Sequence, residues 1–289
     1  AQAAASAGAD LMVSHPAVAD PTDFRGLPWP DAANGQASFL PFGDFARALR
    51  AERPLVWFLD DLGQAPAAVQ AAAMQLLLAR QVNGHQLPEH VTFVAATNRR
   101  TDRAGVSGIL TPVLSRFASV VELAPSLDDW CAWAYAAGVD DALIAFLRFR
   151  PDLLSAFDPA AASDMRPFPC PRTWARAGAL LGLGLPADVR LAALAGAVGE
   201  GPAGELVSFL RLREQMPSLD GILMDPAAAP LPREAAVLYA VAAGLAARAT
   251  SANIGAIGRY LQRLNDAGQA EFAALTLRDA YRRDRGLAA

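Results

Sequence analysis

The chain has 289 residues and a formal net charge of −4, and 53% of its residues are hydrophobic against 19% that are charged. This apolar balance excludes a largely disordered chain, and the weakly acidic charge argues against nucleic-acid binding as the main activity. The two cysteines, Cys131 and Cys170, belong to no CxxC pair, so the sequence indicates neither a zinc site nor a disulfide framework. Segment 1–9 lacks the basic and apolar regions of a signal peptide, and no apolar run reaches the roughly 20 residues of a membrane span, so we expect a cytoplasmic protein.

The first fifty residues predict one strand, one loop and one helix. The strand is predicted at 10–14, a rigid, polar and turn-rich loop at 19–29, and a helix with one apolar side at 42–51. Pro54 stops this helix.

Two apolar runs of strand length end abruptly in polar side chains. Leu55–Leu59 is followed directly by Asp60 and Asp61, and the run that begins at Val91 ends at Asn98. This pattern is typical of buried parallel strands that carry reactive groups at their carboxyl ends, where α/β sheets bind their ligands.

A helix and a hairpin are predicted between these two strands. Pro66 stands near the start of a long helix at 67–80, and the Asn83-Gly84 pair indicates a tight hairpin turn. One further short strand is predicted at 119–123.

From Ser126 onward the pattern changes to helices punctuated by proline and glycine, with no convincing strand. Ser126 is expected to cap the first of them. Further helices are predicted at 140–149, from Thr173 or Trp174, at 232–250 and at 253–266.

The change of pattern predicts an α/β domain at 1–125, a helical domain at 126–215 and a C-terminal helical region at 216–289. Arginines of the helical region are expected to lie on solvated faces. These arginines are Arg148, Arg150, Arg282, Arg283 and Arg285.

Four short motifs in this chain resemble, in order, those of AAA+ ATPases, and the resemblance is closest to the MoxR-like branch. They are Phe58–Asp61, Ala95–Asn98, Ser115–Phe117 and Pro171–Arg172. Segments 20–28 and 64–70 also look like stretches of MoxR-type and phage-type relatives, so the resemblance spans about residues 10 to 215.

The resemblance implies a P-loop NTPase fold, with a parallel α/β core, a helical lid and further C-terminal helices. It implies ATP and magnesium as cofactors. Asp60 would hold Mg²⁺ through water, and Asp61 would polarise the attacking water. Asp61 stands where this family usually has glutamate, and its side chain is shorter by one methylene.

Three further residues receive roles from the resemblance. Asn98 would orient the attacking water or sense the γ-phosphate, because an amide both donates and accepts hydrogen bonds. Arg116 would be an arginine finger offered to the nucleotide of a neighbouring subunit, and Arg172 would be the sensor arginine of the lid and contact the nucleotide.

Each of these residues also has an ordinary structural explanation. The paired aspartates could cap a helix, and Asn98 could be a turn residue. Arg116 could be a surface ion-pair partner and Arg172 could form a salt bridge between lid and core. The histidines show no metal-ligand spacing and are expected at the surface or in turns: His15, His85 and His90.

The phosphate-binding segment of the family is missing, because the chain contains no GxxxxGK[ST] loop and no lysine. In a P-loop fold, the strand that leads into this loop precedes the strand predicted at residues 10–14. We therefore expect an AAA+ core that lacks its first strand, through N-terminal truncation rather than through loss of nucleotide binding.

The implied function is ATP-driven remodelling or chaperoning of a client or adaptor protein by a homo-oligomeric, hexameric ring, with this fragment inactive on its own. The alternative is a non-enzymatic binding or scaffold module on a degenerate AAA+ fold. A DNA-loading ATPase would need a basic channel that the composition does not indicate.

Overall fold

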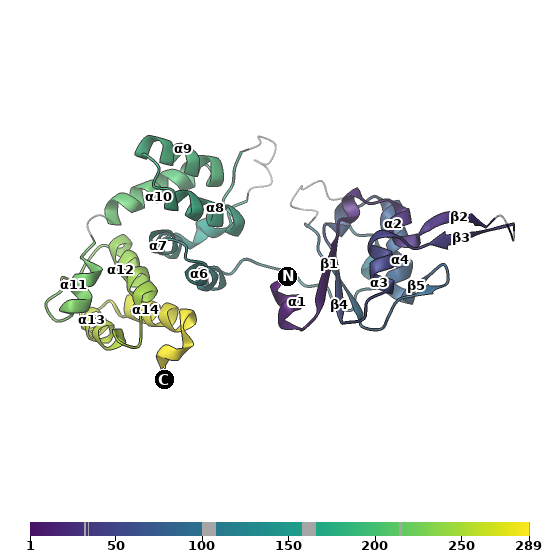
Figure 1. Cartoon of the computed structure of the whole chain (residues 1–289). Coiled ribbons are helices and arrows are strands. Elements are labelled where there is room, and N and C mark those ends of the chain that lie inside the picture. Colours follow the sequence, from purple (N-terminus) through teal and green to yellow (C-terminus); the bar gives the residue numbers. More distant parts are fainter. Residues whose placement is uncertain (32, 34, 100–107, 158–165, 214–215, 289) are drawn as a thin grey trace. The chain divides into compact units, whose positions relative to one another are not determined.

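The structure is a computed structural model that describes residues 1–31, 33, 35–99, 108–157, 166–213 and 216–288. It has two compact units, Ala1–Glu122 and Leu123–Ala289 (Figure 1). The first unit mixes strands and helices, and the described residues of the second contain helices without strands. The predicted boundary near residue 125 lies three residues from the observed one. The described residues after 215 belong to the same unit as those from 123 onward.

A three-stranded parallel sheet organises the first unit. Its strands are β1 (Asp10–Ser14), β4 (Leu55–Leu59) and β7 (Val91–Ala95), in the order β1-β4-β7. All three strands were expected from the apolar runs, and the expected α/β class is confirmed. Because the strands are parallel and in register, their carboxyl ends form one edge of the sheet.

One face of the sheet is covered and supports the core. Trp57 at its centre is fully buried, stacks at 6.2 Å on Phe24 and at 5.2 Å on Phe93, and donates its indole N–H to Ser14 Oγ. Phe24 and Phe45 come from helices packed on this face (Figure 1). The helices and 3-10 turns of the unit are α1 (Gln2–Ser6), η1 (Pro16–Val18), α2 (Pro21–Arg25), α3 (Gly43–Leu49), η2 (Leu62–Gln64), α4 (Ala67–Ala79) and α5 (Thr111–Leu114).

The other face of the sheet is open. Val13, Phe58 and Val94 stand opposite one another across the three strands, and Val13 and Val94 are 42% and 43% exposed. Parallel sheets are normally covered on both faces, since their strands are apolar throughout. Among the described residues, this row is therefore an apolar surface that is incompletely covered, with Val13 and Val94 exposed and Phe58 half-buried between them.

The predicted hairpin is confirmed, but the predicted loop at 19–29 is wrong. Strands β5 (Gln81–Val82) and β6 (His85–Gln86) flank Asn83 and Gly84, which both have the positive φ that a tight hairpin turn requires. Segment 19–29 instead contains α2 and the start of a second hairpin, β2 (Leu27–Asp31) with β3 (Gln36–Leu40). Asp20 and Asp23 form a reciprocal capping box that starts α2, a signal already present in the sequence.

The strand predicted at 119–123 does not form, although the structure describes all five residues. Val120, Val121 and Leu123 are 72%, 82% and 94% exposed. A strand needs a hydrogen-bonding neighbour, and this apolar segment has none among the described residues. The prediction was wrong because β propensity alone does not supply the partner.

The second unit begins where the sequence predicts. Ser126 caps the first helix by accepting a hydrogen bond from the Asp129 N–H, and the predicted helices at 140–149, 232–250 and 253–266 are confirmed with slightly shorter bounds. No described helix is long and apolar enough to cross a membrane. The helices and 3-10 turns are α6 (Leu127–Ala136), α7 (Asp141–Phe149), η4 (Pro151–Leu154), α8 (Pro171–Gly182), α9 (Ala187–Val198), α10 (Glu200–Arg213), α11 (Leu219–Met224), α12 (Ala235–Arg248), α13 (Ile254–Asp266), α14 (Ala270–Arg283) and η6 (Arg285–Ala288).

Helix α12 lies at the centre of the second unit and packs against both α7 and α14. One side of it contributes Ala236, Ala240 and Ala243 to a core that also contains Trp174. Its other side contributes residues such as Val241 to a core formed with α13 and α14. The helices before and after residue 216 are therefore joined through a shared element.

Arg148 is buried, which contradicts its predicted place on a solvated face. It donates two hydrogen bonds to the Asp279 carboxylate, at 2.6 and 3.2 Å, and one to Asp128. The sequence held a signal, because residues 142–147 of the same helix are all apolar and all buried. Arg150 is more exposed and pairs with Asp152.

The prediction of solvated arginines at 282, 283 and 285, at the end of α14 and the start of η6, is correct for two of the three. Arg282 and Arg285 are exposed. Arg283 is instead half-buried and donates to the backbone oxygens of Ala246 and Ala249, at and just beyond the end of α12. It therefore anchors α14 to the central helix.

Candidate functional site

The carboxyl edge of the sheet brings the ends of β1, β4 and β7 together. Ser14, Leu59 and Ala95 are in register, and the chain continues past this line with backbone hydrogen bonds. The Asp60 N–H donates to Ser14 O at 2.9 Å, and the Leu62 N–H donates to Ala96 O at 3.0 Å. The backbone of Asp60 is thus fixed on one side by β1, and the following turn is fixed by the end of β7.

Asp60 carries an accessible carboxylate at this edge. Its side chain is 39% exposed, and its Oδ2 lies 3.9 Å from Nδ1 of His15. This pair is an ion pair only when His15 is protonated. No hydrogen bond to the Asp60 carboxylate occurs within the described residues, so its oxygens are available to the hydration shell of a cation.

Asp61 has a left-handed backbone, with φ 56° and ψ 37°. Its carbonyl accepts the Gln64 N–H at 2.9 Å, which closes the η2 turn, and its side chain makes no capping hydrogen bond. The structural alternative of a helix-capping carboxylate therefore does not describe Asp61. Aspartate is one of the few residues that tolerate this conformation, whereas glutamate is disfavoured. The backbone thus gives a physical reason for aspartate at position 61.

Asn98 is exposed and lies three residues beyond β7, at the same edge as Asp60. Its backbone oxygen accepts the hydroxyl of Thr97 at 3.1 Å. The edge therefore combines two carboxylates after one strand with an amide after its neighbour. The described residues contain no group of three or more histidine, cysteine or carboxylate side chains suited to direct metal binding.

Arg116 follows the short helix α5, which is held in place by a buried glutamine. The side chain of Gln70, only 1% exposed, donates to Gly108 O at 3.1 Å and accepts the Leu110 N–H at 2.9 Å. The guanidinium of Arg116 donates to Pro112 O, one turn back, and its Nε is buried without a partner among the described residues. In this arrangement the side chain folds along its own helix.

Arg172 belongs to the second unit, apart from the other four predicted residues. Helix α8 begins at Pro171, two to three residues earlier than expected, and its start is fixed by the Cys170 N–H donating to Thr173 Oγ1 at 2.8 Å. Arg172 is exposed in the first turn and has no hydrogen bond or ion pair among the residues that the structure describes.

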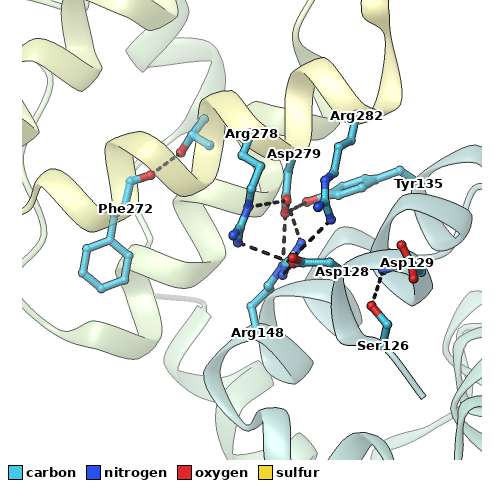
Figure 2. A network of polar contacts seen from close by, with 10 residues as sticks. Ser126, Asp128, Asp129, Tyr135, Arg148, Phe272, Arg278, Asp279 and Arg282 are labelled. Carbon is cyan, nitrogen blue, oxygen red and sulfur yellow. Dashed lines mark hydrogen bonds and ion pairs between the residues drawn. The ribbon is translucent and has the colours of Figure 1, made fainter. Parts of the chain in front are cut away.

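A polar network within the second unit was missed by sequence reasoning (Figure 2). Arg148 of α7 sits between Asp128 of α6 and Asp279 of α14, and Arg278 and Arg282 of α14 reach the same carboxylates. Burial raises the pKa of the Asp279 carboxyl. The hydrogen bond from Arg148 lowers the pKa of Asp128.

The remaining predicted surface groups make backbone contacts. His85 Nε2 lies 2.9 Å from Phe39 O, and His90 Nε2 lies 2.7 Å from Ala51 O.

Burial raises the pKa of Cys131 to about 12, which keeps this thiol protonated.

Comparison with known proteins does not assign the chain. No protein-family model matches it, and no curated protein sequence matches it.

Proposed function

We propose that the first unit is the hydrolytic portion of a MoxR-like AAA+ ATPase core. The observation that carries this proposal is the shared edge of the sheet, where Asp60 and Asp61 follow β4 and Asn98 follows the adjacent parallel strand β7. A magnesium ion, a nucleophilic water and a γ-phosphate all need groups that converge at one sheet edge. The motif order of the sequence provides the second argument.

The proposal includes one further strand and helix, supplied from outside residues 1–289. Support comes from the uncovered row Val13, Phe58 and Val94, and from the edge of β7 that no described strand occupies. The apolar segment 119–123, which has no strand partner among the described residues, supports it as well. A strand that pairs with β7 and leads through a glycine-rich turn into a helix would use this edge and cover this face.

In the completed site each residue has a defined task. Asp60 binds the hydration shell of Mg²⁺, and Asp61 polarises the attacking water, with Asn98 orienting it. Bound ATP and Mg²⁺ supply the phosphoryl group and neutralise the charge that develops on it. Arg116 leaves the Pro112 carbonyl and donates to the nucleotide of the next subunit, while Arg172 of the lid contacts the nucleotide of its own subunit.

We propose that ATP hydrolysis drives the remodelling of a client or adaptor protein by a homo-oligomeric ring. The ring follows from the proposed role of Arg116, which acts on the nucleotide site of a neighbouring subunit. The acidic net charge of −4 favours a protein client over nucleic acid.

The test uses a protein extended by the in-frame coding sequence upstream of Ala1. We expect the extended protein to bind Mg-ATP and to hydrolyse it. Asp60→Asn should remove hydrolysis, and Arg116→Ala should lower turnover by about 10³-fold or more while ATP binding is retained. Asp10→Asn and Arg47→Ala are matched controls. Asp10 lies at the opposite end of β1, and Arg47 is an exposed arginine of α3.

Two results would contradict the proposal. Absence of Mg-ATP binding in the extended protein would favour a scaffold module on a degenerate ATPase fold. Unchanged turnover in Arg116→Ala would remove the finger role and with it the argument for a ring.

A further inference from the structure

Helix α6, the end of α14 and the start of η6 border an open depression of about 490 Å³ that is lined by three arginines. Arg278 and Arg282 lie one helical turn apart on α14. Arg285 lies beyond the extended Asp284, at the start of η6, and lines the same depression. Asp129, Ala132 and Tyr281 complete the lining.

The three arginines at this depression use few of their N–H donors in hydrogen bonds with the described residues. Arg278 approaches Asp128 at 3.6 Å, and Arg282 approaches the same carboxylate at 3.3 Å. Neither contact is a hydrogen bond in the structure. Arg285 has no ion pair or hydrogen bond within the described residues. A guanidinium has five N–H donors, so all three side chains can donate to a ligand.

Two neighbouring carboxylates, Asp128 and Asp279, already pair with the buried guanidinium of Arg148. Arg148 donates to Asp279 at 2.6 Å and to Asp128 as well, and it is only 5% exposed (Figure 2). The lining of the depression itself contains three arginines and one carboxylate, Asp129. Arg278 and Arg282 belong to the same network through their contacts with Asp128.

We propose that this depression binds a phosphate ester. Three guanidinium groups can surround a tetrahedral oxyanion, whereas a carboxylate is satisfied by a single bidentate arginine. The volume exceeds that of a phosphate group alone, and the ring of Tyr281 offers a surface for the attached organic group. The site lies within the second unit and does not depend on the ATPase proposal.

The test is calorimetric titration of the 289-residue chain with inorganic phosphate and with phenyl phosphate. We expect saturable binding of both, tighter for phenyl phosphate. Arg282→Gln and Arg285→Gln should each weaken it at least tenfold. Arg285 makes no hydrogen bond or ion pair with the described residues, so this variant tests the site without unfolding the unit.

Controls separate this site from general charge effects and from the sheet edge. Arg248→Gln removes an equal charge from an exposed ion pair with Asp220 elsewhere in the unit and should leave binding unchanged. Asp60→Asn should also leave it unchanged. Absence of saturable binding, or equal weakening by Arg248→Gln, would overturn the proposal. Binding of inorganic phosphate but not of phenyl phosphate would overturn the assignment to an ester.

Discussion

The left-handed backbone of Asp61 gives the first prediction at the scale of single residues. Asp61→Glu should lower the free energy of unfolding of the first unit by about 1 kcal/mol, because glutamate tolerates the left-handed conformation less well than aspartate does. Asp61→Gly should cost nothing or stabilise slightly, since glycine adopts positive φ freely. Asp60→Glu adds the same methylene at a residue without positive φ and is the control. Chemical denaturation measures all three, and an equal loss in Asp60→Glu and Asp61→Glu would contradict the backbone explanation.

The buried pair of Arg148 and Asp279 gives a second residue-scale prediction. Arg148→Met or Asp279→Leu alone should cost about 3–5 kcal/mol, because the first leaves the buried Asp279 without its hydrogen-bonded cation and the second leaves the buried Arg148 with Asp128 as its one hydrogen-bonded carboxylate among the described residues. The double variant should recover most of this loss, since apolar side chains of similar volume need no partner there. A double-mutant cycle by chemical denaturation measures the coupling. Additive losses would show that the pair acts through packing instead of charge.

At the scale of elements, the open face of the sheet predicts that substitutions on the two faces of β7 lower the free energy of unfolding by different amounts. Val94→Thr should cost less than about 0.5 kcal/mol in the 289-residue chain, because its side chain is already 43% exposed. Val91→Thr, on the same strand but fully buried, should cost about 1–3 kcal/mol, because a hydroxyl enters the core. In the upstream-extended protein Val94→Thr should become nearly as costly. If it stays neutral there, the proposed helix does not cover this face.

Elements whose signals are local could be predicted from the sequence. The strands β1, β4 and β7 follow from apolar runs of strand length, and the β5–β6 turn follows from Asn83-Gly84. The strand at 119–123 could not be predicted reliably, because pairing depends on a neighbour that local propensity does not encode. At the candidate site the sequence predicted the shared edge of Asp60 and Asn98. The left-handed Asp61 and the contact of Arg116 with Pro112 are outcomes of backbone geometry that no residue pattern specified.

At the scale of the whole molecule, the shared helix α12 predicts that the segments before and after residue 216 unfold together. Cys131 of α6 is fully buried and protonated, so a thiol reagent should label it only when the second unit opens. In a Cys170→Ser background no other cysteine remains. Tyr260→Ala, a core substitution in α13, should cost about 3–5 kcal/mol and raise the labelling rate of Cys131 by about 10²-fold or more, although the two residues belong to different core clusters.

The control is Arg259→Ala, an exposed neighbour of Tyr260 on the same helix, which should leave the labelling rate unchanged. Mass spectrometry of samples quenched at successive times gives both rates directly. If Tyr260→Ala destabilises the C-terminal helices without changing the labelling of Cys131, then residues 126–215 and 216–289 open separately, as the sequence pattern alone predicts. If both respond, the packing of α12 against α7 and α14 makes the second unit a single cooperative body, and any force that acts on α14 also reaches the helices before residue 216.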